Sequence, residues 1–409
     1  MRNHPGRLTP GAGPGLPVLL LLVPSLLVAQ AKPRVRDLGL PIGGTPGPLD
    51  AITDVAGVEV GHTTLIAGAG KLEVGRGPVR TGVTVIHPRG RNDADAVFGA
   101  WFTLNGNGEM TGTTWLEESG FLEGPVAITN THSVGVVRDA VLQWQVTRPQ
   151  MQPWGLPVVA ETYDGGLNDI NGFHVKPEHV LRALDGARGG PVTEGNVGGG
   201  TGMVCHQFKG GIGTASRKLD PAAGGWTVGV LVQCNYGTRQ AFAVAGVPVG
   251  EEIPDLLPCV ASAAAPAGRR RCDDPVRPAP RDDDGAGSII VVVATDAPLL
   301  PHQLKRLARR VPLGVGRMGG RGENSSGDIF IAFSTANPRA AADTGRPTIA
   351  MVPNARINPL FAATIQATEA AIVNAMLAAE TMTGADDLRV YALPVDRLTA
   401  AMRKYGRVR

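Results

Sequence analysis

The chain has 409 residues, of which 43% are hydrophobic, 18% are charged and only 4% are aromatic. This composition is typical of a globular protein with ample material for a core, and it excludes general disorder. The formal net charge is +3, and the basic residues lie scattered without the clustered stripe of a nucleic-acid-binding surface, so we expect no nucleic-acid partner.

The N-terminus has the layout of a secretory signal peptide at residues 1–31. Two arginines precede an apolar stretch at residues 16–28, and the small-residue sequence Ala-Gln-Ala follows at residues 29–31. The apolar stretch is shorter than the roughly 20 residues of a spanning helix, and prolines interrupt it. We therefore expect cleavage after residue 31, a periplasmic or secreted protein, and no membrane span, because no later segment is expected to reach spanning length.

Short β-like runs separated by glycine turns, such as GVTVIHP and WTVGVLVQCNYG, fill most of residues 53–248. Helical patterns interrupt these runs at residues 134–146 and around residues 177–187. Strands interspersed with helices predict a mixed class of helices and strands rather than an all-β fold.

Residues 258–287 have the composition of a linker, since Ala, Pro, Arg and Asp dominate and large apolar side chains are almost lacking. A linker of this length inside a compact domain is usually functional or disordered. A β-branched, apolar run at residues 288–293 follows at once and predicts a buried strand. Ser288 therefore stands at the boundary between an exposed loop and a buried strand.

Three further elements are predicted after this strand. An apolar spacing at residues 304–311 indicates an amphipathic helix, and the sequence GDIFIAFSTA at residues 327–336 indicates a strand. A long Ala-rich helix is expected to begin with Asn358 as its N-cap and Pro359 at its first position, and to end near residue 381. Its composition favours a buried, closely packed helix.

After export, the four cysteines are expected to be in an oxidising compartment, where disulfides can form. Cys259 and Cys272 flank an Ala-, Pro- and Arg-rich segment where a disulfide would close a small loop, and the residues leave open whether they pair. Cys205 and Cys234 lie in strand-like runs, where we expect small buried apolar side chains. The sequence has no CxxC motif, no HExxH motif and no histidine pair at helical ligand spacing, so we predict neither a metal site nor a cofactor.

The motif that remains is Ser288 preceded by Gly-Ala-Gly, because the chain has no G-x-S-x-G elbow and no phosphate-binding loop. This arrangement suggests self-cleavage. Attack of the Ser288 hydroxyl on the Gly287 carbonyl would convert the peptide bond to an ester, and hydrolysis would leave Ser288 as a new N-terminus. The freed α-amino group, with an ordinary pKa of about 7.7 to 8.0, would then act as base toward its own hydroxyl.

Four stretches carry a resemblance to a known family: GSIIVVVATDAPLLPHQLKRLARR, SSGDIFIAFSTAN, GGGTGMVCHQFKGGIGTASRK and VGVLVQCNYG. They are similar to the DmpA/BapA family of self-processing serine aminopeptidases, the L-aminopeptidase/D-esterase and β-peptidyl aminopeptidase group. The resemblance implies an α+β fold, a four-layer αββα sandwich of the DmpA/ornithine-acetyltransferase type. It further implies a large chain of residues 32–287 and a small chain of residues 288–409 that remain one structural domain, and a tetramer of such processed heterodimers.

The same resemblance assigns roles around the predicted cleavage point between Gly287 and Ser288. The nucleophile falls on Ser288, and two supporting polar residues fall on Ser326 and Asp328. One residue separates this supporting pair, so both side chains are expected on one face of a strand. The base is left open between this pair and the freed Ser288 amine.

Three more residues are assigned by resemblance to the substrate side of the site. Asn235 matches the oxyanion-stabilising amide, and Tyr163 matches a phenol that lines the same site. Glu161 matches the carboxylate that holds the free amine of the substrate, and its alternation with Tyr163 places both on one face of the sequence VVAETYDG.

The predicted activity is removal of N-terminal residues, small, D- or β-amino acids among them, from small peptides, amides or esters with a free amino group, through an acyl-enzyme on Ser288. The alternatives are an acyltransferase of the ornithine-acetyltransferase kind, which export disfavours, and a processed binding protein without catalysis. Two features depart from the family pattern: the insertion between Cys259 and Cys272, and Glu323 and Asn324 where small residues are expected. Side-chain preference and stereochemistry stay open.

Overall fold

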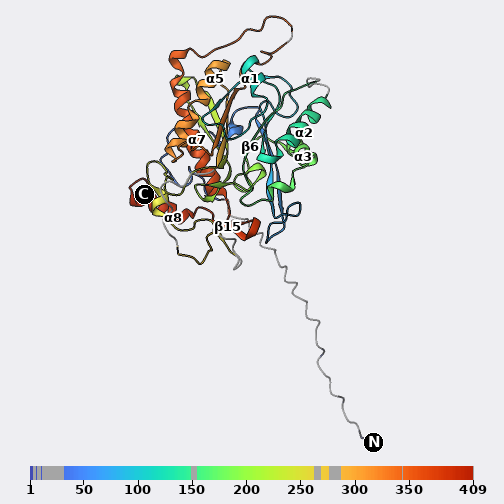
Figure 1. Ribbon diagram of the computed structural model, residues 1–409, viewed down its shortest axis with the longest axis vertical. Helices are drawn as coiled ribbons and strands as arrows, with labels where there is room; N and C mark the ends of the chain where they lie inside the picture. Colours follow the sequence, from blue (N-terminus) through green and yellow to red (C-terminus); the bar gives the residue numbers. More distant parts are fainter. Residues whose placement is uncertain are drawn as a thin grey trace. The chain divides into compact units, whose positions relative to one another are not determined.

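Two β-sheets lie face to face between layers of helices in the part of the chain that the structure describes (Figure 1). The structure is a computed structural model that describes residues 1, 2, 6, 11, 32–148, 154–261, 269–275, 287–342 and 344–408. The rest of the predicted signal peptide, and residues 262–268 and 276–286 of the predicted linker, lie outside the described residues. Pro33–Arg409 forms one compact unit.

The larger sheet holds the predicted strand that begins at Ser288. Its described strands run in the order β4 (Phe121–Leu122), β3 (Val97–Thr103), β13 (Gly327–Ser334), β12 (Ser288–Thr295), β10 (Thr227–Asn235) and β9 (Gly211–Lys218). The smaller sheet has the order β1 (Glu59–Ala67), β2 (Val79–His87), β5 (Val126–Asn130) and β6 (Val158–Thr162). In the larger sheet, β12 pairs antiparallel with β10 and parallel with β13.

The side chains of β12 fill two cores, which explains why its sequence is apolar throughout. Ile290 and Val292 belong to the core between the two sheets. Ile289 and Val291 point the other way, into the core between the larger sheet and its helices. Because successive strand residues face opposite sides, a strand covered on both faces has no polar positions left in its middle.

Helices cover the outer face of each sheet, which completes the predicted αββα order of layers. Figure 1 shows α5 and α7 on the side opposite α2 and α3. Apolar residues of α5, α6 and α7 pack on the larger sheet, and those of α2 and α3 pack on the smaller one. The α-helices of the described residues are α1 (Thr113–Ser119), α2 (Val134–Val146), α3 (Pro177–Gly186), α4 (Val249–Glu252), α5 (Pro301–Ala308), α6 (Val311–Arg317), α7 (Asn358–Ala378) and α8 (Val395–Lys404).

The long helix α7 corrects two expectations. Within the described residues it is the helix long and apolar enough to cross a membrane by length and composition, so the expectation that no later segment reaches spanning length was wrong. Its apolar 18-residue window is 83% buried inside the protein, which accounts for its apolar sequence. The predicted N-cap was also wrong by one residue, because Ile357 holds that position and Asn358 is already helical.

Two small sheets lie outside the main layers, and two disulfides join described parts of the chain. The strands are β7 (Val204–Cys205) and β8 (Phe208–Lys209) in one sheet, and β11 (Cys259–Val260), β15 (Leu388–Val390) and β14 (Met382–Thr383) in the other. Cys259 and Cys272 are joined, which closes the small loop ahead of the predicted cleavage point. Cys205 and Cys234 are buried as expected but are also joined, so treating them only as small apolar side chains was wrong.

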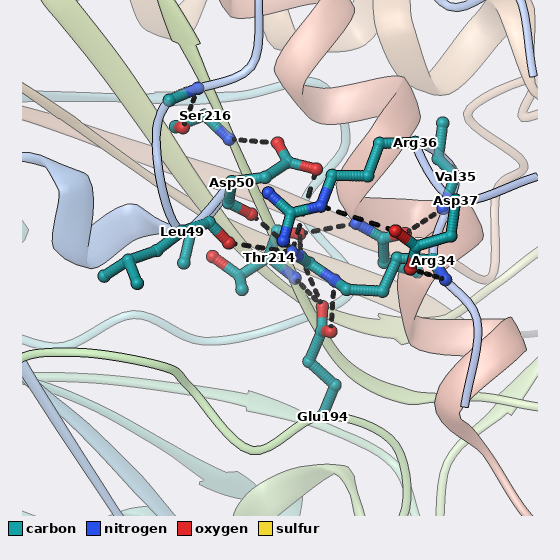
Figure 2. A network of polar contacts seen from close by, with 12 residues as sticks. Arg34, Val35, Arg36, Asp37, Leu49, Asp50, Glu194, Thr214 and Ser216 are labelled. Carbon is teal, nitrogen blue, oxygen red and sulfur yellow. Dashed lines mark hydrogen bonds and ion pairs between the residues drawn. The ribbon is translucent and has the colours of Figure 1, made fainter. Parts of the chain in front are cut away.

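A buried ionic network ties the first residues of the compact unit to strand β9 (Figure 2). The Arg34 guanidinium pairs with Glu194 at 2.8 Å and donates to the Thr214 carbonyl at 2.6 Å. Asp50 accepts a hydrogen bond from Ser216 N at 3.0 Å in the same network. Buried charges are stable only when paired and hydrogen-bonded, as they are here. The predicted signal peptide ends just before this anchor.

Candidate active site

Ser288 is the first residue of β12, and the sheet register sets a neighbour on each side of it. Asn235, the last residue of β10, lies opposite Ser288 in the antiparallel pair. Gly327, the first residue of β13, lies beside it in the parallel pair and donates its N–H to Ser288 Oγ at 3.1 Å. The end of one strand and the starts of two others therefore meet at Ser288.

The predicted supporting pair forms a hydrogen bond next to this point, although only Asp328 lies in β13 and Ser326 precedes its first residue, so the expectation of a shared strand was wrong for Ser326. Ser326 Oγ donates to Asp328 Oδ1 at 2.6 Å, and both residues are buried. Asn105, which follows β3, donates through Nδ2 to Asp328 Oδ2 at 3.3 Å and accepts from Asp328 N at 2.6 Å. Burial raises the pKa of the Asp328 carboxyl, while the hydrogen bonds from Ser326 and Asn105 act against that rise. Asn105 is thus a hydrogen-bond partner of Asp328 that could not be identified from the sequence.

Two backbone groups fix the side-chain amide of Asn235. Its Oδ1 accepts from Val204 N at 2.7 Å, and its Nδ2 donates to the Tyr163 carbonyl at 3.0 Å. A carboxamide nitrogen carries two hydrogens, so the second remains available toward the cavity that Asn235 lines. This amide is therefore oriented in advance to donate a hydrogen bond beside Ser288.

Glu161 reaches the site from β6 of the smaller sheet and is almost fully buried. Its Oε1 accepts from Glu109 N at 3.0 Å, and its Oε2 accepts from the Thr131 hydroxyl. Burial raises the pKa of the Glu161 carboxyl, and these two hydrogen bonds oppose the rise. The charged groups of the described residues that act most on Glu161 are Glu109 and the His132 imidazole, with no Lys or Arg beside them, so a cationic group bound here would relieve the cost of burying its charge.

A cavity of about 760 Å³ joins these groups. Glu161, Tyr163, Asn235, Gly287 and Ser288 all line it. Tyr163 directly follows the last residue of β6 and is 54% exposed, so it lies at a solvent-exposed part of this cavity. The predicted supporting pair of Ser326 and Asp328 is buried and is not among the described residues that line this cavity. Across the described ranges, no group of three or more His, Cys, Asp or Glu side chains could hold a metal ion.

Gly287 lies against the backbone of β10, and this close approach requires glycine. A Cβ atom at position 287 would lie 2.1 Å from the Asn235 carbonyl oxygen and 2.9 Å from Tyr236 Cα. Real Cβ atoms do not approach backbone atoms this closely. The residue before Ser288 can therefore be seated beside Asn235 only because it has no side chain.

The loop that follows β3 supplies contacts that sequence reasoning did not find. Asn105 holds the Asp328 carboxylate, and Glu109 N holds the Glu161 carboxylate. Thr131, after β5, adds the second hydrogen bond to Glu161. The sequence Asn-Gly-Asn-Gly at residues 105–108 is a turn signal. It marks a loop, but it carries no information about which strand ends the loop will reach.

Comparison with known proteins agrees with this architecture. A family model described as Peptidase family S58 matches residues 50–390. The beta-peptidyl aminopeptidase BapA of Sphingosinicella microcystinivorans is 54% identical over 397 residues, which cover 95% of this chain and 97% of that protein.

Two solved structures are also similar over most of the chain. The L-aminopeptidase D-Ala-esterase/amidase from Ochrobactrum anthropi, described as a new variant among the Ntn hydrolase fold, has a TM-score of 0.81 and 46% identity, and the match covers 92% of this chain and 100% of that one. A Burkholderia sp. beta-aminopeptidase has a TM-score of 0.78 and 48% identity, with 91% and 99% covered. The resemblance and the sandwich fold inferred from the sequence are confirmed, and the chain belongs to peptidase family S58.

Proposed function

We propose that this chain is an aminopeptidase that activates itself by cutting the Gly287–Ser288 bond and then uses Ser288 as nucleophile. The observation that carries the proposal is the convergence at Ser288. The Asn235 amide, which hydrogen bonds hold in place, and the closely packed Gly287 lie beside the Ser288 hydroxyl. The buried Glu161 lines the same cavity. The names of the relatives, beta-peptidyl aminopeptidase and L-aminopeptidase D-Ala-esterase/amidase, point to substrates with a free amine.

The self-cleavage step uses only groups of this chain and water. Ser288 Oγ attacks the Gly287 carbonyl carbon, the C–N bond breaks, and the Ser288 nitrogen leaves as an amine while an ester forms at Oγ. Water then hydrolyses the ester, which releases the carboxylate of Gly287 and restores the hydroxyl. The product is a chain that begins with a free amine at Ser288. An amine of this kind has an ordinary pKa of about 7.7 to 8.0, so part of it is neutral near pH 7.

Turnover repeats the same chemistry on a bound substrate. Ser288 Oγ attacks the scissile carbonyl, and its proton passes to a base and then to the leaving amine. The Nδ2 group of Asn235 donates to the oxyanion of the tetrahedral intermediate. Water hydrolyses the acyl-enzyme. The Ser288 amine is one candidate base, and the Ser326 hydroxyl held by Asp328 at 2.6 Å is the other.

Glu161 supplies the preference for a free N-terminus in this scheme. A substrate ammonium bound in the cavity beside the Glu161 carboxylate forms a charge-assisted hydrogen bond worth about 1.5 to 3 kcal/mol. An acetylated N-terminus has no charge to offer, and it leaves the buried carboxylate unpaired. The expected discrimination against blocked substrates is therefore roughly one to two decades.

A Glu161→Gln variant is expected to lower kcat/KM for a free-amine substrate by roughly 10- to 100-fold. The value of kcat/KM for the acetylated substrate should change little. The free form loses its charge partner, whereas the blocked form never had one. Glu109→Gln is the matched control, because it removes a carboxylate from the same cavity and leaves Glu161 in place. The measurement is kcat/KM for the free and acetylated forms of one anilide. Equal hydrolysis of both forms by the wild type would indicate a general amidase.

Self-cleavage of a Gly287→Ala variant is expected to be about 10²-fold slower. The added Cβ would clash with the Asn235 carbonyl and so displace the scissile Gly287 carbonyl from its position beside Asn235. Gly316→Ala is the matched control, since an added Cβ at position 316 meets no atom within 4 Å. The rate at which the small chain appears on a denaturing gel is the measurement. Processing of Gly287→Ala at the wild-type rate would show that the close packing of Gly287 against Asn235 is not needed for self-cleavage.

Export is part of the proposal. The signal layout at residues 1–31 supports it. The N-terminal sequence of protein recovered from the periplasm or the medium tests it, and a start just after residue 31 is expected.

A further inference from the structure

Lys209 is a buried cation that the proposed mechanism does not use. It lies in β8 and is fully buried. Its Nζ donates to the carbonyls of Met203 at 2.8 Å, Gly210 at 2.9 Å and Gly200 at 3.4 Å. No carboxylate in the described part of the chain pairs with it, and burial lowers the pKa of its ammonium to about 7.

A single peptide unit connects this ammonium to Asn235. The carbonyl of Met203 and the N–H of Val204 belong to the same peptide group, and the N–H donates to Asn235 Oδ1 at 2.7 Å. Hydrogen bonding at the carbonyl end of a peptide polarises it and strengthens the donor at its other end. The chain of contacts therefore runs from Lys209 Nζ through this peptide to Asn235.

We propose that Lys209 is a positioning residue for the Asn235 amide: its ammonium holds and polarises the Met203–Val204 peptide, and that peptide orients Asn235 toward the oxyanion. The proposal rests on the proposed function, because it takes Asn235 as the oxyanion donor. In its protonated form Lys209 also places a positive charge behind the amide, which favours a negative charge in front of it.

The competing explanation is that Lys209 only holds together the glycine-rich segment around it. An apolar side chain of similar length would fill the same space without the cost of burying a cation, although it would take a hydrogen-bond donor from the carbonyls of Gly200, Met203 and Gly210. Backbone groups alone already connect this segment, since Gly210 N donates to the Met203 carbonyl at 2.9 Å. A buried ammonium at this place therefore suits an electrostatic task better than a filling task.

The test is a double-mutant cycle with Lys209→Met and Asn235→Ala in the processed enzyme. We expect Lys209→Met to lower kcat about tenfold with KM nearly unchanged, the scale of a charge acting through one intervening group. In the Asn235→Ala background the same change should cost almost nothing, because the amide that Lys209 positions is gone. Lys218→Met is the matched control. That lysine is exposed, lies on β9 and donates to the Thr227 hydroxyl at 3.2 Å.

The outcomes separate this inference from the function on which it rests. If Asn235→Ala itself leaves kcat unchanged, the oxyanion assignment fails. If Asn235→Ala lowers kcat but the two effects multiply independently, Asn235 stands and the positioning role of Lys209 is overturned. Lys209→Gln keeps a hydrogen-bond donor without the charge, and we expect it to fall between the wild type and Lys209→Met. Failure of both neutral variants to melt cooperatively would overturn the positioning role in favour of a structural one.

Discussion

A Ser288→Ala variant is expected to accumulate as one uncut chain and to lose kcat by up to about 10⁶-fold, the order of loss when a serine hydrolase loses its nucleophile. Both defects follow from one missing atom, because the same hydroxyl starts the acyl shift at Gly287 and later attacks the substrate. The structure supports this double use, since Ser288 Oγ lies at the cavity and also directly follows the seated Gly287. A denaturing gel and a steady-state assay of the purified variant measure the two effects.

A Ser288→Cys variant is the control for this experiment. A thiol can make the analogous shift, so some processing should remain, while hydrolysis changes with the different leaving group. Complete cleavage of purified Ser288→Ala without added protease would show that another enzyme cuts the linker.

Asn235→Ala is expected to lower kcat by about 10²- to 10³-fold with a much smaller change in KM. The amide is held by Val204 N and the Tyr163 carbonyl before any substrate binds, so its donor acts mainly when the oxyanion forms. Asn196→Ala is the matched control, because that amide donates to the Glu380 carbonyl at an exposed position. A raised KM with kcat intact would make Asn235 a binding residue instead.

The elements of the fold that could be predicted from the sequence are those whose burial leaves a local pattern. The helix predicted at residues 134–146 has those bounds in α2, because one stripe of it packs on the smaller sheet. The strand at Ser288 was recognisable because both of its faces are buried. The bond between Cys205 and Cys234 was not predictable, since it depends on β7 lying beside the end of β10, which is a tertiary contact.

The candidate site likewise contains residues that could be predicted from local sequence motifs and residues that depend on contacts formed only in the folded protein. Most site residues lie in motifs that carry the family resemblance, and Glu161 and Tyr163 alternate along the sequence, although β6 ends between them at Thr162. Asn105 and Thr131 were missed because each follows a strand and reaches a carboxylate on the neighbouring strand of the same sheet, so each contact depends on a strand pairing that the sequence does not show. Lys209 stood in a recognised motif, but an isolated lysine in a sequence gives no sign that it will be fully buried.

The most direct test of the central claim is the cleavage of full-length wild-type chain made by cell-free translation and followed at several dilutions. Self-cleavage predicts that a chain of residues 288–409, with serine at its N-terminus, appears at a first-order rate that does not depend on protein concentration. Aminopeptidase activity should rise in step with it. An uncut chain with full activity, a cut at another bond, or a rate that rises with protein concentration would contradict self-cleavage by Ser288.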